Sequence, residues 1–152
     1  MNRDFRDLLS EFNAHGVEYL VVGAHALAAH GHVRATKDLD VWVRPASENA
    51  QRVLRALRGF GAPLQDLSEE DLTHPGVIFQ IGLPPVRVDV LTSISGVAFD
   101  EAWKDRLVTR FADQTVGVLS REHLIRSKRA AGRTQDLADI ERLETEGREA
   151  NG

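Results

Sequence analysis

The sequence predicts an α/β (α+β) fold in which a small mixed β-sheet is flanked by helices. Short β-prone runs alternate along the chain with amphipathic helical patterns, an order typical of a sheet covered by helices. The chain has 152 residues, of which 42% are hydrophobic, and such a chain can bury one core without disulfides or structural metals. We therefore expect residues 1–146 to form a single domain that ends in a helical segment, and residues 147–152 to be a frayed tail.

The expected helices are marked by hydrophobic spacing and by glycines that end them. Phe5, Leu8, Leu9 and Phe12 recur at i, i+3, i+4 and i+7, which indicates an amphipathic helix that ends at Gly16. The same reasoning predicts five further helices, at residues 24–30, 47–59, 99–104, 121–131 and 134–146.

The expected strands are short runs rich in valine, leucine and isoleucine. They span residues 19–22, 38–43, 77–81, 86–91 and 115–119. A Gly-Leu-Pro-Pro segment predicts a turn between the third and fourth of these strands. The polar stretch 63–75 is expected to be irregular.

Composition and charge argue against several classes of protein. The chain has no cysteine, so it forms neither a disulfide framework nor a thiolate zinc site. Its first residues lack the apolar core of a signal peptide, and no apolar run approaches membrane-spanning length. We therefore expect a cytoplasmic protein that does not bind a membrane. The net charge of −4 argues against non-specific binding to DNA, and no specific DNA binding is expected.

Two aspartates, Asp38 and Asp40, lie at the start of a strand that should enter the core. Because strand side chains alternate between faces, both carboxylates lie on one face, and Leu39 and Val41 face the core. Like charges on one face repel, and a cation between them relieves the repulsion. Carboxylate oxygens suit Mg²⁺ or Mn²⁺. The alternative is a solvated pair that protects an edge strand.

A third carboxylate, Asp89, lies in the middle of the apolar strand 86–91, although aspartate is depleted in strands. If this strand pairs beside residues 38–43, three carboxylates converge, and such a triad can hold two divalent ions for phosphoryl transfer. The alternative is an ion pair between Asp89 and the neighbouring Arg87 on an exposed sheet face.

The segment before these aspartates suits a phosphate group. A strand runs into Gly23 and Ala24 and then into a short helix, an arrangement that directs backbone N–H groups at an anion. Arg34 and Thr36, just upstream of Asp38, are expected to contact a triphosphate through a guanidinium and a hydroxyl. The alternative is a simple tight turn at Gly23 and a surface position for Arg34.

Lys128 falls within the inward stripe of the expected helix 121–131, because it lies i+4 from Leu124 and i+3 from Ile125. A buried ammonium group needs a partner. We expect Lys128 to point at the carboxylate site or at the nucleotide phosphates. The alternative is a lysine whose stem covers apolar surface while its head stays in water.

The motif GAHALAAHGHVRATKDLD at 23–40, followed by VDVLT at 88–92, resembles the small nucleotidyltransferases of the polymerase-β superfamily. The resemblance is closest to the minimal, single-domain bacterial type that includes toxin-like members of toxin–antitoxin pairs. The segment LIRSKRAAGRTQDLADIERL at 124–143 is similar to the C-terminal helical segment of that family. One difference is the Gly23–Ala24 pair, where the family usually has Gly-Gly or Gly-Ser.

The resemblance implies a polymerase-β-like fold and an Mg²⁺-dependent transfer of NMP from an NTP, such as ATP, to a hydroxyl group. It implies that Asp38, Asp40 and Asp89 bind the metal, which carries the triphosphate, and that Asp89 also helps to activate the attacking hydroxyl. The acceptor would be an RNA such as tRNA, a protein or a small molecule, and an antitoxin protein is an expected partner.

Two other functions remain compatible with the residues. Glycosyltransferases also use a D-x-D motif to hold a sugar nucleotide through a metal, although they leave Asp89 unexplained. A non-catalytic module that binds a nucleotide or a protein partner on the same fold is the second alternative. Mg²⁺-dependent release of pyrophosphate from NTPs distinguishes the transferase from both.

Overall fold

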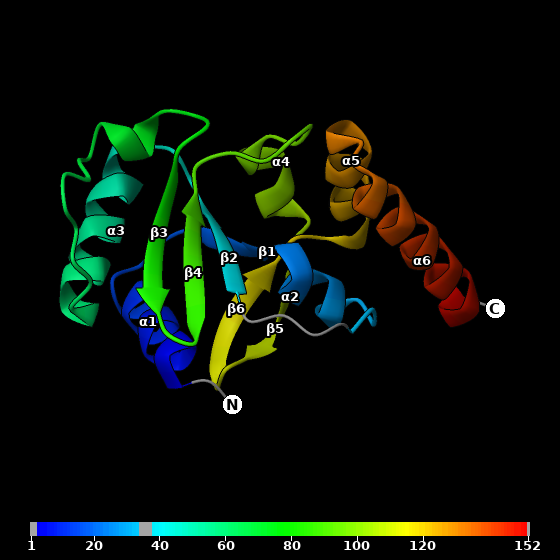
Figure 1. The fold of residues 1–152 in the computed structure, drawn as a ribbon, viewed down its shortest axis with the longest axis horizontal. Helices are drawn as coiled ribbons and strands as arrows, with labels where there is room; N and C mark the ends of the chain where they lie inside the picture. The colour runs from blue at the N-terminus through cyan, green and yellow to red at the C-terminus, as the bar shows by residue number, and fades with distance from the viewer. Residues whose placement is uncertain (1–2, 34–37, 152) are drawn as a thin grey trace.

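The computed structural model describes residues 3–33 and 38–151. The described chain forms one mixed sheet with the strand order β3-β4-β2-β1-β6-β5, and helices lie against it (Figure 1). The strands are β1 (Tyr19–Val22), β2 (Asp38–Val43), β3 (Ile78–Leu83), β4 (Val86–Leu91), β5 (Leu107–Phe111) and β6 (Gln114–Val118). The helices are α1 (Arg3–Ala14), α2 (Gly23–Ala29), α3 (Ser47–Phe60), the short 3-10 turn η1 (Asp71–Thr73), α4 (Phe99–Lys104), α5 (Arg121–Ala131) and α6 (Thr134–Asn151).

The predicted mixed sheet is confirmed. β1 pairs antiparallel with β2 and parallel with β6, while β2 pairs parallel with β4. The hairpins β3–β4 and β5–β6 complete the sheet at its two ends. The parallel pairing of β2 with β4 brings the strand that begins with two aspartates beside the strand that carries the third.

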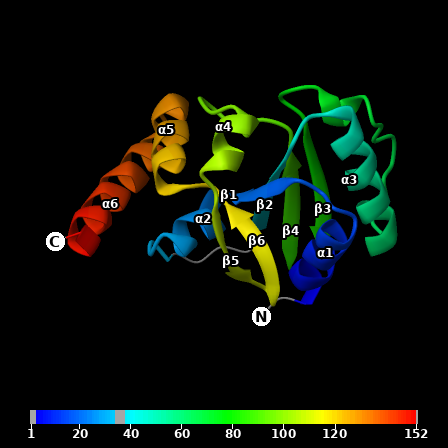
Figure 2. The same ribbon diagram turned by 180° about the vertical axis from the view of Figure 1, so that it is seen from behind.

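Helices α1 and α3 pack against each other and cover one face of the sheet, as Figure 2 shows. Phe5, Leu8, Leu9 and Phe12 are all buried, as their helical spacing predicts. Helices α5 and α6 instead extend from one side of the sheet (Figure 1). None of the described helices is both long and apolar enough to cross a membrane.

Helix α3 ends later than its sequence predicts. Gly59 was expected to end it, but the helix continues to Phe60, and Gly61, with φ of 89°, forms the left-handed cap. A Cβ on Gly59 would lie 2.5 Å from Oε2 of Glu11 on α1. This oxygen is the flexible end of the Glu11 side chain, which can move away from such a group. Helix α6 likewise continues to Asn151, beyond the predicted end at residue 146.

Strand β5 is absent from the strands that the sequence predicts. Most of its residues are exposed, because β5 forms the edge of the sheet. The turn that joins β5 to β6 is made by Ala112 and Asp113, with φ of 50° and 60°. An Ala-Asp pair lacks the glycine or asparagine that usually marks such a turn.

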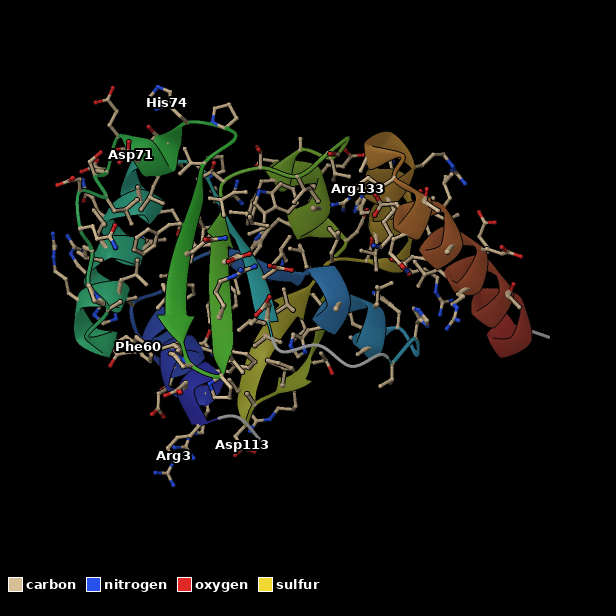
Figure 3. All side chains as sticks on the ribbon, in the orientation of Figure 1. Arg3, Phe60, Asp71, His74, Asp113 and Arg133 are labelled. Carbon is tan, nitrogen blue, oxygen red and sulfur yellow. The ribbon has the colours of Figure 1, made fainter. Side chains whose placement is uncertain are left out.

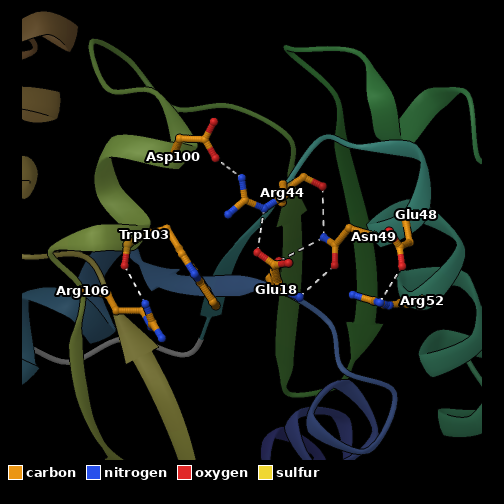
Figure 4. Close-up of polar contacts among 8 residues, drawn as sticks. All are labelled: Glu18, Arg44, Glu48, Asn49, Arg52, Asp100, Trp103 and Arg106. Carbon is orange, nitrogen blue, oxygen red and sulfur yellow. Dashed lines mark hydrogen bonds and ion pairs between the residues drawn. The ribbon is translucent and has the colours of Figure 1, made fainter.

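A polar network fixes the C-terminal end of β2 (Figure 4). The buried side chain of Asn49 accepts a hydrogen bond from the Glu18 backbone at 2.8 Å and donates to the backbone oxygens of Glu18 and Arg44, each at 3.0 Å. Arg44 pairs with Glu18 and stacks on the ring of Phe99 in α4. Phe99 in turn covers Trp42, which is buried. These contacts cover the C-terminal end of β2, and the aspartates lie at its N-terminal end.

Candidate active site

The three aspartates predicted from the sequence come together on the sheet. In the register of β2 with β4, Asp38 lies opposite Arg87 and Asp40 lies opposite Asp89. Register neighbours on paired strands point to the same face, and the backs of these strands, Leu39, Val41, Val88 and Val90, are fully buried. The carboxylates therefore share one face, as alternation predicted.

Arg87 lies among these carboxylates. Its Nε donates to Oδ1 of Asp89 at 2.9 Å and its Nη2 to Oδ2 of Asp89 at 3.3 Å, while Nη2 also lies 3.3 Å from Oδ2 of Asp38. The ion pair that was the alternative explanation for Asp89 is thus present. It coexists with the convergence of the three carboxylates, because Arg87 is the register partner of Asp38.

The surroundings of Asp40 disfavour its charged form. Burial, followed by the negative charges of Asp89 and Asp38, raises the pKa of Asp40 from its ordinary value of 3.8 to about 6. The positive charge of Arg87 lowers this pKa, but burial and the two neighbouring carboxylates outweigh it. A site of this kind attracts cations with oxygen ligands.

Gly23, at the start of α2, lies directly against Asp40. Its φ is +69°, which other residues adopt only with strain, and a Cβ there would be 2.2 Å from Oδ2 of Asp40. Gly23 and Ala24 both line the cavity that contains the aspartates. The turn thus lies beside the carboxylates, and its glycine serves the close approach as well as the backbone conformation. That the turn binds a phosphate stays a prediction.

The opposite wall of the cavity comes from α5 and α6. Nζ of Lys128 donates to Oδ2 of Asp139 at 2.9 Å and lies 3.5 Å from Oδ1 of Asp136. The side chain of Lys128 is only 11% exposed, and its ammonium is held by these carboxylates rather than by open water. Lys128 also lines the aspartate cavity, and its contact with a nucleotide stays a prediction.

Sequence reasoning missed Asp136 and Asp139 as parts of this wall. Both are buried, and they are three residues apart in α6, so they face the same side. Their spacing before the buried Ile140 and Leu143 was the available signal. Arg133 pairs with Asp136 at 2.7 Å, and Figure 3 places it at the junction of α5 and α6.

Two adjoining cavities lie between the sheet and these helices. The first, of about 380 Å³, is polar and contains the three aspartates with Gly23, Arg87 and Lys128. The second, of about 530 Å³, has a more apolar lining that includes Ile94, Leu119 and Leu124. Gly23, Asp40, Lys128, Arg133 and Asp136 line both. These volumes are in the range of small-molecule sites.

Two predicted site residues, Arg34 and Thr36, lie outside the described residues.

Within the described ranges, no group of three or more histidine, aspartate or glutamate side chains is already arranged to hold a metal ion. The donor chemistry of Asp38, Asp40 and Asp89 nevertheless suits a hard divalent cation, and Arg87 occupies part of the space that such an ion would need.

Comparison with known proteins relates the chain to nucleotidyltransferases. Residues 4–146 match the family model described as "Nucleotidyltransferase of unknown function (DUF6036)". No curated protein matches the chain. Among the solved structures that share its fold, two have a TM-score of 0.59. One is a candidate nucleotidyltransferase, TM1012 from Thermotoga maritima, 17% identical, covering 98% of this chain and 91% of that one.

The second is the lincosamide antibiotic adenylyltransferase LnuA with lincomycin bound, 14% identical, covering 95% of this chain and 96% of that one. At these identities the likeness concerns the fold, which agrees with the resemblance to small nucleotidyltransferases. Because the family model spans nearly the whole chain, the protein belongs to this family of nucleotidyltransferases.

Proposed function

We propose that the protein transfers the NMP group of an NTP to a hydroxyl acceptor in an Mg²⁺-dependent reaction. The observation that carries the proposal is the convergence of Asp38, Asp40 and Asp89 at the edge of a cavity between the sheet and α5–α6. Three carboxylates on one face suit the charge of a metal–triphosphate complex, and they have no comparable use in binding an anion alone.

In this proposal the acidic residues of the cavity bind the metal, and Lys128 and Gly23 face the phosphates. Asp38, Asp40 and Asp89 would hold Mg²⁺ or Mn²⁺, which supplies neutralisation of the phosphate charge. Asp89 would also accept the proton of the attacking hydroxyl. Lys128, fixed in the opposite wall by Asp139, would face the phosphates, and Gly23 allows the backbone to approach them. Such catalysis consists mainly of positioning and charge stabilisation.

The adjoining cavity with the apolar lining would receive the nucleoside or the acceptor, because both need a site beside Asp40. The acceptor class in this proposal is a hydroxyl on an RNA such as tRNA, a protein or a small molecule. LnuA is described as acting on an antibiotic, which favours a small molecule by analogy. A toxin role, an antitoxin partner and a cytoplasmic location belong to the same proposal and rest on the family resemblance.

The test is label transfer from each α-labelled NTP in a cell extract, together with Mg²⁺-dependent pyrophosphate release. Asp89→Asn should reduce both by at least about 100-fold. Asp66→Asn, an exposed aspartate outside the site, is the matched control and should keep full activity. Binding of NTP without any turnover in the unaltered protein would instead favour the non-catalytic module.

A further inference from the structure

Arg87 is placed by the sheet itself, not by a flexible loop. It is the register partner of Asp38 on β2 and lies two residues before Asp89 on β4. Both relationships put its side chain on the face of the carboxylates. An arginine at position 87 therefore lies beside the carboxylates of Asp38 and Asp89, and its contacts with them follow from the β2–β4 register.

The guanidinium engages the oxygens that a divalent cation would need. It makes a two-pronged contact with Oδ1 and Oδ2 of Asp89 and reaches Oδ2 of Asp38. A planar guanidinium suits this bidentate arrangement well. A divalent ion at bonding distance from the same oxygens would lie within a few ångströms of the guanidinium, and the two positive charges would repel each other.

Arg87 differs from Lys128, a second cation in the lining of the aspartate cavity. The side chain of Arg87 is 46% exposed, so its guanidinium can move into water at little cost. Lys128 is 11% exposed and is held by Asp136 and by Asp139, which is fully buried. Of the two, only Arg87 can move its own charge into water, and an arriving metal ion would then compensate the buried carboxylate of Asp89.

We propose that Arg87 is a built-in counter-ion that competes with the divalent cation for Asp38 and Asp89. It keeps the two carboxylates together and partly neutralised, and it leaves them when the metal binds. Arg87 therefore acts as a positioning residue that sets the metal affinity of the site. The inference rests on the proposed function, because it takes Asp38, Asp40 and Asp89 as the metal ligands.

The test is calorimetric titration of the nucleotide-free protein with Mg²⁺ and with Mn²⁺. Arg87→Gln should bind either ion roughly tenfold more tightly than the unaltered protein, because the competing charge is gone. Arg87→Lys, which keeps the charge but not the two-pronged contact, should fall between them. Arg52→Gln, on α3 and outside both cavities, is the matched control and should leave the affinity unchanged.

Thermal melting provides a second readout. Without metal, Arg87→Gln should melt at a lower temperature than the unaltered protein, because the carboxylates repel. With saturating Mn²⁺ the difference should vanish or reverse. A merely structural arginine would lower the melting temperature equally in both conditions.

The outcomes separate this inference from the proposed function. If the unaltered protein binds metal and Arg87→Gln binds it equally or more weakly, Arg87 does not compete and the inference is wrong, while the proposed function stands. If neither protein binds metal, the proposed metal site is wrong and the inference fails with it. Should Arg87→Gln not fold, the same comparison is decided by Arg87→Lys.

Discussion

Replacing Gly23 by alanine should impair the site far more than it impairs the fold. Two effects act at this position: the backbone has φ of +69°, and the new Cβ would lie 2.2 Å from Oδ2 of Asp40. Gly16 offers a matched control, because it has the same φ of +69° and nothing within 4 Å of its Cβ position. Gly16→Ala therefore measures backbone strain alone.

The magnitudes follow from this pair. An alanine in the left-handed conformation costs about 1–2 kcal/mol, and both variants should lose that much stability. In Gly23→Ala, Asp40 must also retreat by about 1 Å to reach an ordinary contact distance. A carboxylate can do so by rotation at a further cost of about 1 kcal/mol, but a misplacement of about 1 Å in a site can reduce turnover about 100-fold.

Urea unfolding and pyrophosphate release test the two effects separately. The free energies of unfolding of the two variants should agree within about 1 kcal/mol. Pyrophosphate release should fall about 100-fold in Gly23→Ala and hardly at all in Gly16→Ala. Equal activity in both variants would show that the contact between Gly23 and Asp40 has no functional role.

Two further predictions concern charge. The pKa of Asp40 is raised from its ordinary value of 3.8 to about 6 in the folded protein. Between pH 3.8 and about pH 6 the folded protein therefore binds more protons than the unfolded chain. Asp40 consequently lowers the free energy of unfolding more and more as the pH rises through that interval. Asp40→Asn should therefore exceed the unaltered protein in stability at about pH 7.5, and urea unfolding should show the advantage disappear near pH 4; a constant difference would contradict this. Lys128→Met should lose about 3 kcal/mol of stability in urea unfolding, because the buried Asp139 loses its ammonium partner. Adding Asp139→Asn should restore part of that loss. A loss well under about 1 kcal/mol in Lys128→Met would show that the ion pair is unimportant.

The sequence alone predicted which residues carry the carboxylates and which strand face they occupy. Alternation placed Asp38 and Asp40 on one side of a strand, and the isolated acidic residue in VRVDVL identified Asp89. Both inferences depend only on the two-residue period of a strand. The convergence of the three carboxylates also required that β2 pair with β4. The sequence did not settle this pairing, because register depends on the whole sheet.

Features that depend on tertiary contacts were not predictable in the same way. Alternation put Arg87 on the face of Asp89, but its contact with Asp38 required the inter-strand register. The partners of Lys128 come from another helix, so its helical spacing indicated burial without indicating Asp136 or Asp139. Strand β5 was missed because its turn lacks the usual residues.

The most direct test of the account is the position of Mn²⁺ in a crystal of the protein, located by anomalous diffraction with a non-hydrolysable NTP present. The account predicts Mn²⁺ about 2.0–2.3 Å from carboxylate oxygens of Asp38, Asp40 and Asp89, with the guanidinium of Arg87 withdrawn from them. Mn²⁺ bound elsewhere, or bound while Arg87 keeps its contacts with Asp38 and Asp89, would contradict it.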